Sequence, residues 1–400
     1  MKRYINFLVY FIVFTLLMTG CRKDIEPQEV VPNADLFVSA TSLGVFPKAS
    51  LQAFAVSAGL SVYTSFVKYD VEFYKFVYNT TYKGKIIQAS GLLAIPKNVQ
   101  GVPSLLSAQH GTMFKATDAP SNFPATFTGF ELFAARGFIT VIPDFIGYGI
   151  SQNIPHPYYD QQYSGFAVID MIKAAKYYLS QKNIAITDRL FLIGYSEGGY
   201  VTMAAQKEIE TNAANKLTVT AAAEGAGGYD LNGMLSAIAN GSTYSAPSYL
   251  ALLLNGYNKT YDWNRPFTDF YQQPYADRIP LLLNGTRKRS EVDDQLNKSL
   301  AALFNPSFYT ALQSPSAETV LKQKLTDNSV LDWVPKSPTR LYHGTADEAV
   351  FYQTSVNTYN RFKAAGATNV ELFAIQNGTH EKSVQPMIEN VLPWIQSLDK

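Results

Sequence analysis

The chain has 400 residues, of which 47% are hydrophobic and 16% are charged, and its formal net charge is +1. This composition predicts a globular protein with a large apolar core, and the balanced charge gives no electrostatic basis for binding nucleic acid. The single cysteine excludes an intramolecular disulfide framework, so packing of the core must stabilise the fold.

The amino-terminal residues predict export and a lipid anchor. A basic start is followed by an apolar run over residues 7–18 and then by small residues up to Cys21, as in a cleaved signal peptide. The cysteine position resembles a bacterial lipobox, in which acyl chains on the cysteine hold the mature protein at a membrane. The alternative is an ordinary signal peptide with an incidental cysteine, because Met18 stands where leucine is usual. We expect a signal peptide over 1–20, a lipidated Cys21, and a polar tether over 21–35.

The next segment predicts a mostly parallel α/β core. Residues 66–96 alternate apolar and polar side chains around "TTYKGK", which indicates two antiparallel strands joined by a hairpin. Beyond them, short apolar runs alternate with longer segments of helical periodicity, which favours a parallel sheet with helices on both faces. The expected strands are 104–109, 138–144, 189–196, 217–225, 339–344 and 369–375, and the expected helices are 125–137, 163–183, 198–210 and 382–398.

The alternation of strands and helices breaks over residues 230–335, which are rich in aromatic side chains. We expect a mainly helical insertion between two strands of the sheet, where a cap over an active site would lie. The alternative is a second domain with its own core and no role at the site. The α/β core would then comprise residues 36–229 and 336–400.

A serine in "GYSEG", residues 194–198, raises the question of function. The sequence fits the G-x-S-x-G pattern, in which the serine occupies a sharp turn from strand to helix with its hydroxyl exposed. The pattern arises often by chance, so it needs support from the rest of the chain. A nucleophilic serine requires a base to take its proton and a third group to orient that base.

Two further residues complete a candidate triad with Ser196. His380, one of only four histidines, lies in a loop after the last predicted strand, and Asp347 follows the strand before it. The order serine, acid, histidine is the order of the α/β-hydrolase architecture. The acid has a runner-up in Glu348. The plainer alternatives are an acidic helix start at Asp347 and an exposed loop position at His380.

The oxyanion of an acyl-transfer intermediate needs hydrogen-bond donors. We expect the backbone N–H of Glu197, directly after the serine, and that of Thr112, with Gly111 as the alternative. His110 would fix this loop. The other two histidines have structural alternatives: His343 is expected to be buried and hydrogen-bonded, and His156 either lines the pocket or supports a turn. The sequence has no zinc-binding motif, no paired cysteines and no complete dinucleotide fingerprint, so neither a metal nor a cofactor is expected.

Several segments carry a family resemblance. "AQHGT", "VIPDFIGYGISQNIPHPYYD", "GYSEGGY", "AAEGAGGYDL", "HGTADEAV" and "NGTH" resemble, in order and spacing, the α/β-hydrolase superfamily and within it the secretory lipase family of carboxylester hydrolases. The resemblance spans roughly residues 85–400, with the cap included by position only. It implies an α/β-hydrolase fold, Ser196, Asp347 and His380 as the triad, and a helical cap that forms the acyl pocket.

The sequence therefore predicts a serine carboxylester hydrolase, an esterase or lipase, that works through an acyl-enzyme. Its substrates would be small-molecule, lipid or polysaccharide esters, and its only membrane contact would be the lipid anchor in the cell envelope. One alternative is a serine peptidase of the prolyl oligopeptidase type, although little chain precedes the core where that family has a propeller. The other is a non-catalytic surface binding protein on a hydrolase scaffold.

Overall fold

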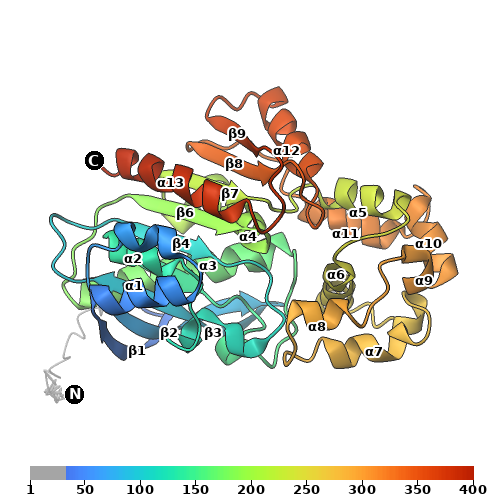
Figure 1. The fold of residues 1–400 in the computed structure, drawn as a ribbon, viewed down its shortest axis with the longest axis horizontal. Helices are drawn as coiled ribbons and strands as arrows, with labels where there is room; N and C mark the ends of the chain where they lie inside the picture. The colour runs from blue at the N-terminus through green and yellow to red at the C-terminus, as the bar shows by residue number, and fades with distance from the viewer. Residues whose placement is uncertain (1–32) are drawn as a thin grey trace, which may run out of the picture. The chain divides into compact units, whose positions relative to one another are not determined.

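A nine-stranded sheet forms the centre of the protein (Figure 1). The computed structural model describes residues 33–400, so the predicted signal peptide, Cys21 and most of the predicted tether lie outside the described residues. The strands are β1 (Phe37–Phe46), β2 (Val71–Tyr82), β3 (Lys85–Pro96), β4 (Leu105–Gln109), β5 (Ile139–Pro143), β6 (Leu190–Tyr195), β7 (Ala221–Gly225), β8 (Thr339–Gly344) and β9 (Val370–Ile375). Their order across the sheet is β1-β2-β3-β5-β4-β6-β7-β8-β9.

The sheet combines an antiparallel edge with a parallel centre. Neighbouring strands are antiparallel from β1 through β2 and β3 to β5. From β5 through β4, β6, β7 and β8 to β9, neighbouring strands are parallel. Strands β4 to β7 are short and wholly buried, which explains why they appear in the sequence as continuous apolar runs. The carboxyl ends of the parallel strands share one edge, and loops after different strands therefore meet there.

The predicted hairpin over residues 66–96 is confirmed. β2 and β3 pair in continuous register from Val71 opposite Pro96 to Tyr82 opposite Lys85. The two turn residues, Lys83 and Gly84, have φ values of 49° and 70°. Positive φ at both positions matches the twist of the flanking strands, so this two-residue turn holds the register of the hairpin.

Helices cover both faces of the sheet (Figure 1). One face is covered by α1 (Lys48–Ser57), α2 (Glu131–Arg136) and α13 (Val384–Leu398), with the short 3-10 helix η1 (Ser61–Phe66) beside them. The other face is covered by α3 (Gln161–Gln181), α4 (Glu197–Thr211) and α12 (Tyr352–Ala364). Over residues 33–400, no helix combines the length and hydropathy that crossing a bilayer requires.

The segment between β7 and β8 is helical and gathers at one end of the sheet, on the right of Figure 1. It contains α5 (Leu231–Asn240), α6 (Pro247–Thr260), α7 (Tyr275–Leu282), α8 (Arg289–Asp293), α9 (Leu300–Leu303), α10 (Pro306–Gln313) and α11 (Thr319–Asn328). Its buried side chains, such as Leu250 and Phe270, belong to the same continuous apolar cluster as Val168 of α3 and Tyr200 of α4. The core of the protein therefore extends into this segment without a break.

Several elements differ from the sequence-based expectation, and helices α1 and α12 are among those that were not expected. No strand was expected at residues 37–46, where β1 forms the edge of the sheet. The pairing of β1 with β2 is irregular at two places, and the irregularities remove the alternation by which a strand is recognised. The helix expected over 125–137 is only α2, because Gly129 (φ 91°) interrupts the backbone before it. Gly137 (φ 124°) ends α2, as the sequence predicted.

Candidate active site

Ser196 occupies the turn between β6 and α4. Its backbone has φ 62° and ψ −126°, a conformation that residues other than glycine rarely adopt. Its N–H donates to the carbonyl oxygen of Gly225 on the neighbouring strand β7, at 2.8 Å, and the residue is 6% exposed. The turn therefore holds the serine in a strained conformation at the carboxyl edge of the sheet.

The glycines around Ser196 permit this turn through close backbone contact. A Cβ atom at Gly194 would lie 2.1 Å from the carbonyl oxygen of Gly198, and one at Gly198 would lie 2.0 Å from the carbonyl oxygen of Gln109. Both neighbours are backbone atoms, which cannot move aside without displacing β4 or α4. The two glycines of the G-x-S-x-G sequence are thus required by the packing of β6, β4 and α4.

His380 lies between Ser196 and Asp347. Its Nε2 atom is 2.8 Å from Ser196 Oγ, and its Nδ1 atom is 2.6 Å from Asp347 Oδ2. The loop that carries it follows β9, and Tyr195 holds this loop by donating its hydroxyl proton to the backbone carbonyl of His380 at 2.5 Å. All three residues of the predicted triad therefore meet at the carboxyl edge of the sheet.

The surroundings of Asp347 determine which nitrogen of His380 carries a proton. Asp347 Oδ1 accepts the backbone N–H groups of Ala349 and Val350, each at 2.9 Å. Burial raises the pKa of Asp347, but hydrogen bonds from His343 and His380 outweigh it and hold the pKa below its ordinary value. An ionised carboxylate only accepts, so Nδ1 of His380 donates to it and Nε2 of the neutral ring is free to accept the serine proton.

Asp347 has a second histidine neighbour that the sequence analysis did not identify. Nε2 of the fully buried His343 lies 3.3 Å from Asp347 Oδ2 and 2.8 Å from the carbonyl oxygen of Val350. Its Nδ1 atom is 2.7 Å from the hydroxyl of Ser355 on α12. The expected buried, hydrogen-bonded role of His343 is confirmed, and its ring also supports the acid. The runner-up acid Glu348 has an exposed side chain.

The loop after β4 lies beside the serine. A Cβ atom at Gly111 would be 3.5 Å from Cβ of Ser196, and the hydroxyl of Thr112 shares a hydrogen bond of 2.9 Å with that of Tyr158. His110 Nδ1 is 2.7 Å from the carbonyl oxygen of Gly111, and its buried ring packs against Phe145, with ring centroids 4.1 Å apart. Burial lowers the pKa of His110, and its Nε2 atom lies 3.3 Å from the carbonyl oxygen of Asp144, so we assign the proton of the ring to Nδ1, which makes the shorter contact.

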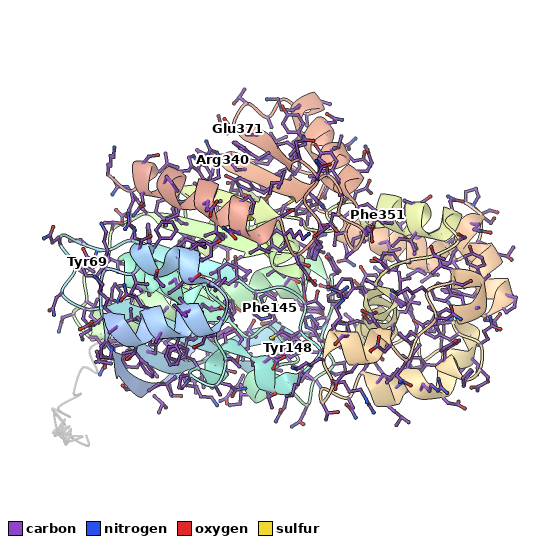
Figure 2. All side chains as sticks on the ribbon, viewed as in Figure 1. Tyr69, Phe145, Tyr148, Arg340, Phe351 and Glu371 are labelled. Atoms are coloured by element: carbon purple, nitrogen blue, oxygen red, sulfur yellow. The ribbon has the colours of Figure 1, made fainter. Side chains whose placement is uncertain are left out.

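This hydrogen bond determines the direction of a backbone N–H. The carbonyl of Gly111 and the N–H of Thr112 belong to one planar trans peptide, and they point in opposite directions. By holding the carbonyl, His110 also fixes the N–H of Thr112. The predicted role of His110 in fixing the loop is therefore confirmed. Phe145 and Tyr148, labelled in Figure 2, belong to the neighbouring loop after β5, between the sheet and the helices of residues 230–335.

Glu197, the residue after the serine, has a buried partner. Its Oε1 atom lies 2.6 Å from Nε2 of His156, while Nδ1 of His156 is 2.7 Å from the carbonyl oxygen of Ile146. The carbonyl only accepts, so Nδ1 carries a proton, and the contact with Glu197 needs one more proton on either atom. The pair is electrically neutral overall in both forms. His156 therefore supports the turn, the structural alternative that the sequence left open.

The helical segment contacts the loop that carries Asp347. The hydroxyl of Tyr244 donates to the carbonyl oxygen of Ala349 at 2.6 Å, and that of Ser245 donates to the carbonyl oxygen of Glu348 at 2.8 Å. Both donors lie between α5 and α6, so the helical segment is hydrogen-bonded to the loop that carries Asp347. Among residues 33–400, no group of three histidine, cysteine or carboxylate side chains has the arrangement of a metal site.

Comparisons with known proteins identify the family and the fold of the chain. A family model described as secretory lipase matches residues 130–397. The fold resembles a protein of Legionella pneumophila named as a hydrolase, with TM-score 0.83, 25% identity, and coverage of 91% of this chain and 98% of that one. Comparison with curated protein sequences finds no significant match.

Two characterised enzymes have the same fold. The rice cell wall degrading esterase LipA of Xanthomonas oryzae, in a ligand-bound form, gives TM-score 0.79 at 22% identity over 91% of this chain and 97% of that one. Candida antarctica lipase A in its closed state gives TM-score 0.64 at 16% identity over 91% and 83%. The predicted α/β-hydrolase fold is confirmed. With two thirds of its length matched by the family model, the chain belongs to the secretory lipase family and is a serine ester hydrolase.

Proposed function

We propose that the protein hydrolyses carboxylesters through an acyl-enzyme on Ser196, with His380 as the base and Asp347 as the residue that orients it. The observation that supports this most directly is the continuous hydrogen-bonded series from Ser196 Oγ through both nitrogens of His380 to Asp347 Oδ2. His380 takes the proton of Ser196 as Oγ attacks the ester carbonyl, and returns it to the departing alkoxide. A water molecule, activated by the same ring, then releases the acid.

The backbone N–H groups of Glu197 and Thr112 are the proposed donors to the oxyanion. The position of Glu197 at the start of α4 and the hydrogen bond from His110 to the Gly111 carbonyl support this assignment. Residues 230–335 serve as the cap segment over the site. Their contacts with the loop that carries Asp347 support that role, and residues 36–229 and 336–400 form the catalytic core.

We also propose that the enzyme acts outside the cytoplasm. The description of its family as secretory supports the export predicted from the amino terminus. Lipidation at Cys21 would then hold it in the cell envelope, where it meets small-molecule, lipid or polysaccharide esters. The cell wall degrading activity named for the LipA esterase makes esters of plant polysaccharide one candidate substrate class.

Labelling with a fluorophosphonate probe tests this proposal against its alternatives. We expect a protein that begins at Arg22 to react with the probe at Ser196, to hydrolyse p-nitrophenyl acetate, and to cleave esters much faster than the matching anilides. Dominant cleavage of anilides would identify a peptidase. Absence of both labelling and hydrolysis would instead indicate a binding protein on a hydrolase scaffold.

Replacing His110 with phenylalanine tests its positioning role. The side chain remains a flat aromatic ring, although a larger one, but the Gly111 carbonyl loses its donor and the N–H of Thr112 loses its fixed direction. Complete loss of one oxyanion donor lowers kcat by about 10²–10³-fold, so a loosened donor is expected to lower kcat by about 10–100-fold with little change in KM. His110→Asn, which offers an amide N–H near the Nδ1 position, should retain more activity. Equal kcat in both variants would contradict the role.

A further inference from the structure

An apolar cavity lies on the face of the sheet covered by α2 and α13. Its volume is about 220 Å³, and most of its walls are apolar side chains. They include Leu60 and Phe66 around the 3-10 helix η1, Phe130 and Leu132 at the start of α2, and Ile388 of α13. Half-buried apolar side chains that converge on an unfilled space are typical of a ligand site.

This cavity extends to residues that adjoin the proposed nucleophile. Gly111 and Tyr195 belong to its lining, and they are the loop residue beside Ser196 and the residue before it. At Gly111 a Cβ atom would have only Cβ of Ser196 and a backbone oxygen of Tyr195 nearby, each at 3.5 Å. Gly111 therefore places no side chain between Ser196 and this part of the cavity lining.

The helix that follows the catalytic histidine forms one wall of the cavity. Val384, Ile388 and Leu392 of α13 line it at intervals of four residues, which places them on one face of the helix. Each interval moves the side chain about 6 Å along the helix axis, away from His380. The hydroxyl of Tyr63 donates to the backbone carbonyl of Gln385 at 3.3 Å and joins η1 to this wall.

The apolar cavity beside the loop that contains Tyr158, on the cap side, is smaller. A second cavity, between α5, α6 and the loop that contains Tyr158, has a volume of about 40 Å³. One water molecule needs roughly 10–15 Å³ of such volume, so this cavity holds a few waters at most. The family resemblance implied an acyl pocket formed by the cap, whereas the larger apolar space lies on the opposite face of the sheet.

We propose that the cavity between η1, α2 and α13 binds the hydrocarbon chain of the ester substrate. This inference rests on the function proposed above and names its substrate class, esters with an extended apolar chain. Each methylene that enters the cavity is removed from water, which corresponds to about a fourfold gain in kcat/KM until the cavity is filled. The length of the cavity along α13 then determines the chain length beyond which kcat/KM no longer increases.

Two bulky substitutions on α13 should limit the chain at different depths. We expect Val384→Phe to end the gain in kcat/KM at a shorter chain than Ile388→Phe, because Val384 lies nearer to His380. Ile388→Ala should move the optimum to longer chains, and it tests the cavity even if the bulky variants fold poorly. The measured quantity is kcat/KM for each chain length divided by that for the acetyl ester.

The matched control is on the cap side. Met234 of α5 is half-buried and lines the small second cavity, so Met234→Phe should leave the chain-length profile of the wild type unchanged. A profile that changes in Met234→Phe and stays constant in the three α13 variants would overturn the inference. So would bulky variants that lower activity on every ester by the same factor, since the cavity would then affect only packing.

Two ester series identify which part of the substrate enters. One varies the acyl chain of p-nitrophenyl esters, and the other varies the alcohol in alkyl acetates. If the bulky α13 variants lose the increase of kcat/KM with chain length in one of the two series, the inference is supported. The series affected shows whether the cavity binds the acyl or the alcohol part of the ester. Failure of the proposed function has a different signature, because the wild type would then hydrolyse no ester and would not react with a fluorophosphonate.

Discussion

Ser196→Ala is expected to lower kcat for p-nitrophenyl esters by about 10⁶-fold, because the reaction loses the atom that forms the acyl-enzyme. His380 and Asp347 remain in place, but without the nucleophile they add almost nothing to the residual rate. The measurement is steady-state hydrolysis of the acetyl ester by enzyme free of wild-type contamination. Retention of more than a small part of the activity would exclude Ser196 as the nucleophile.

The matched variant Ser196→Gly separates chemistry from stability. The φ of 62° and ψ of −126° at this position strain any residue with a Cβ atom, and glycine adopts such angles freely. Ser196→Gly should therefore be as inactive as Ser196→Ala and more stable than the wild type by about 1–3 kcal/mol, as measured by urea unfolding. Equal stability of the glycine and alanine variants would mean that the turn stores no strain.

Asp347→Asn should have the second largest effect, a loss in kcat of about 10⁴-fold. Two backbone N–H groups point at the Oδ1 position, so the carbonyl oxygen of the asparagine must occupy it. The amide NH₂ is then directed at Nδ1 of His380 and forces that nitrogen to accept. The proton of the neutral ring moves to Nε2, which can no longer take the proton of Ser196.

Glu348→Gln is the matched control for this variant. Its side chain is exposed and adjacent in sequence, and it was the alternative acid, so its loss should leave kcat within about twofold. Steady-state kinetics of the two variants at one pH give the comparison. A large loss in Glu348→Gln and a small one in Asp347→Asn would reverse the assignment.

Folding of Asp347→Asn must be measured beside its kinetics. The pKa of Asp347 is held below its ordinary value in the fold, chiefly because two histidine hydrogen bonds outweigh the effect of burial. An aspartate with a lowered pKa stabilises the folded state above its unfolded-state pKa of about 3.9, and this contribution is lost as the pH falls through the folded-state pKa. The asparagine variant lacks this contribution and is expected to be less stable. Its kinetics must therefore be measured at a pH at which the variant is fully folded.

The positions of residues that are determined by the neighbouring sequence could be predicted. Ser196 follows an apolar strand and is flanked by the glycines that the turn requires, and His380 and Asp347 each follow a recognisable strand. Because parallel strands present their carboxyl ends at one edge, these three positions had to lie near one another. The hairpin turn at Lys83 and Gly84 was equally visible, since its neighbours alternate and the turn contains glycine.

Features that depend on contacts between distant segments were not predictable. The approach of His343 to Asp347 depends on the fold of the loop after β8, and that of His156 to Glu197 on two loops far apart in the sequence. The apolar cavity beside the site is a space left between η1, α2 and α13, and no pattern of residues in the sequence indicates such a space. The edge strand β1 was missed because irregular pairing removes its alternation.

The ribosome makes this chain from its amino end, and that direction determines when the enzyme can first act. A nascent chain that extends through α12 already contains the proposed nucleophile and its acid, but it lacks the proposed base and α13. Among the elements described over residues 33–400, the helix that carries one wall of the cavity is synthesised last. A polypeptide that stops before His380 therefore has neither the proposed base nor the α13 wall of the cavity, and we expect it to hydrolyse no ester.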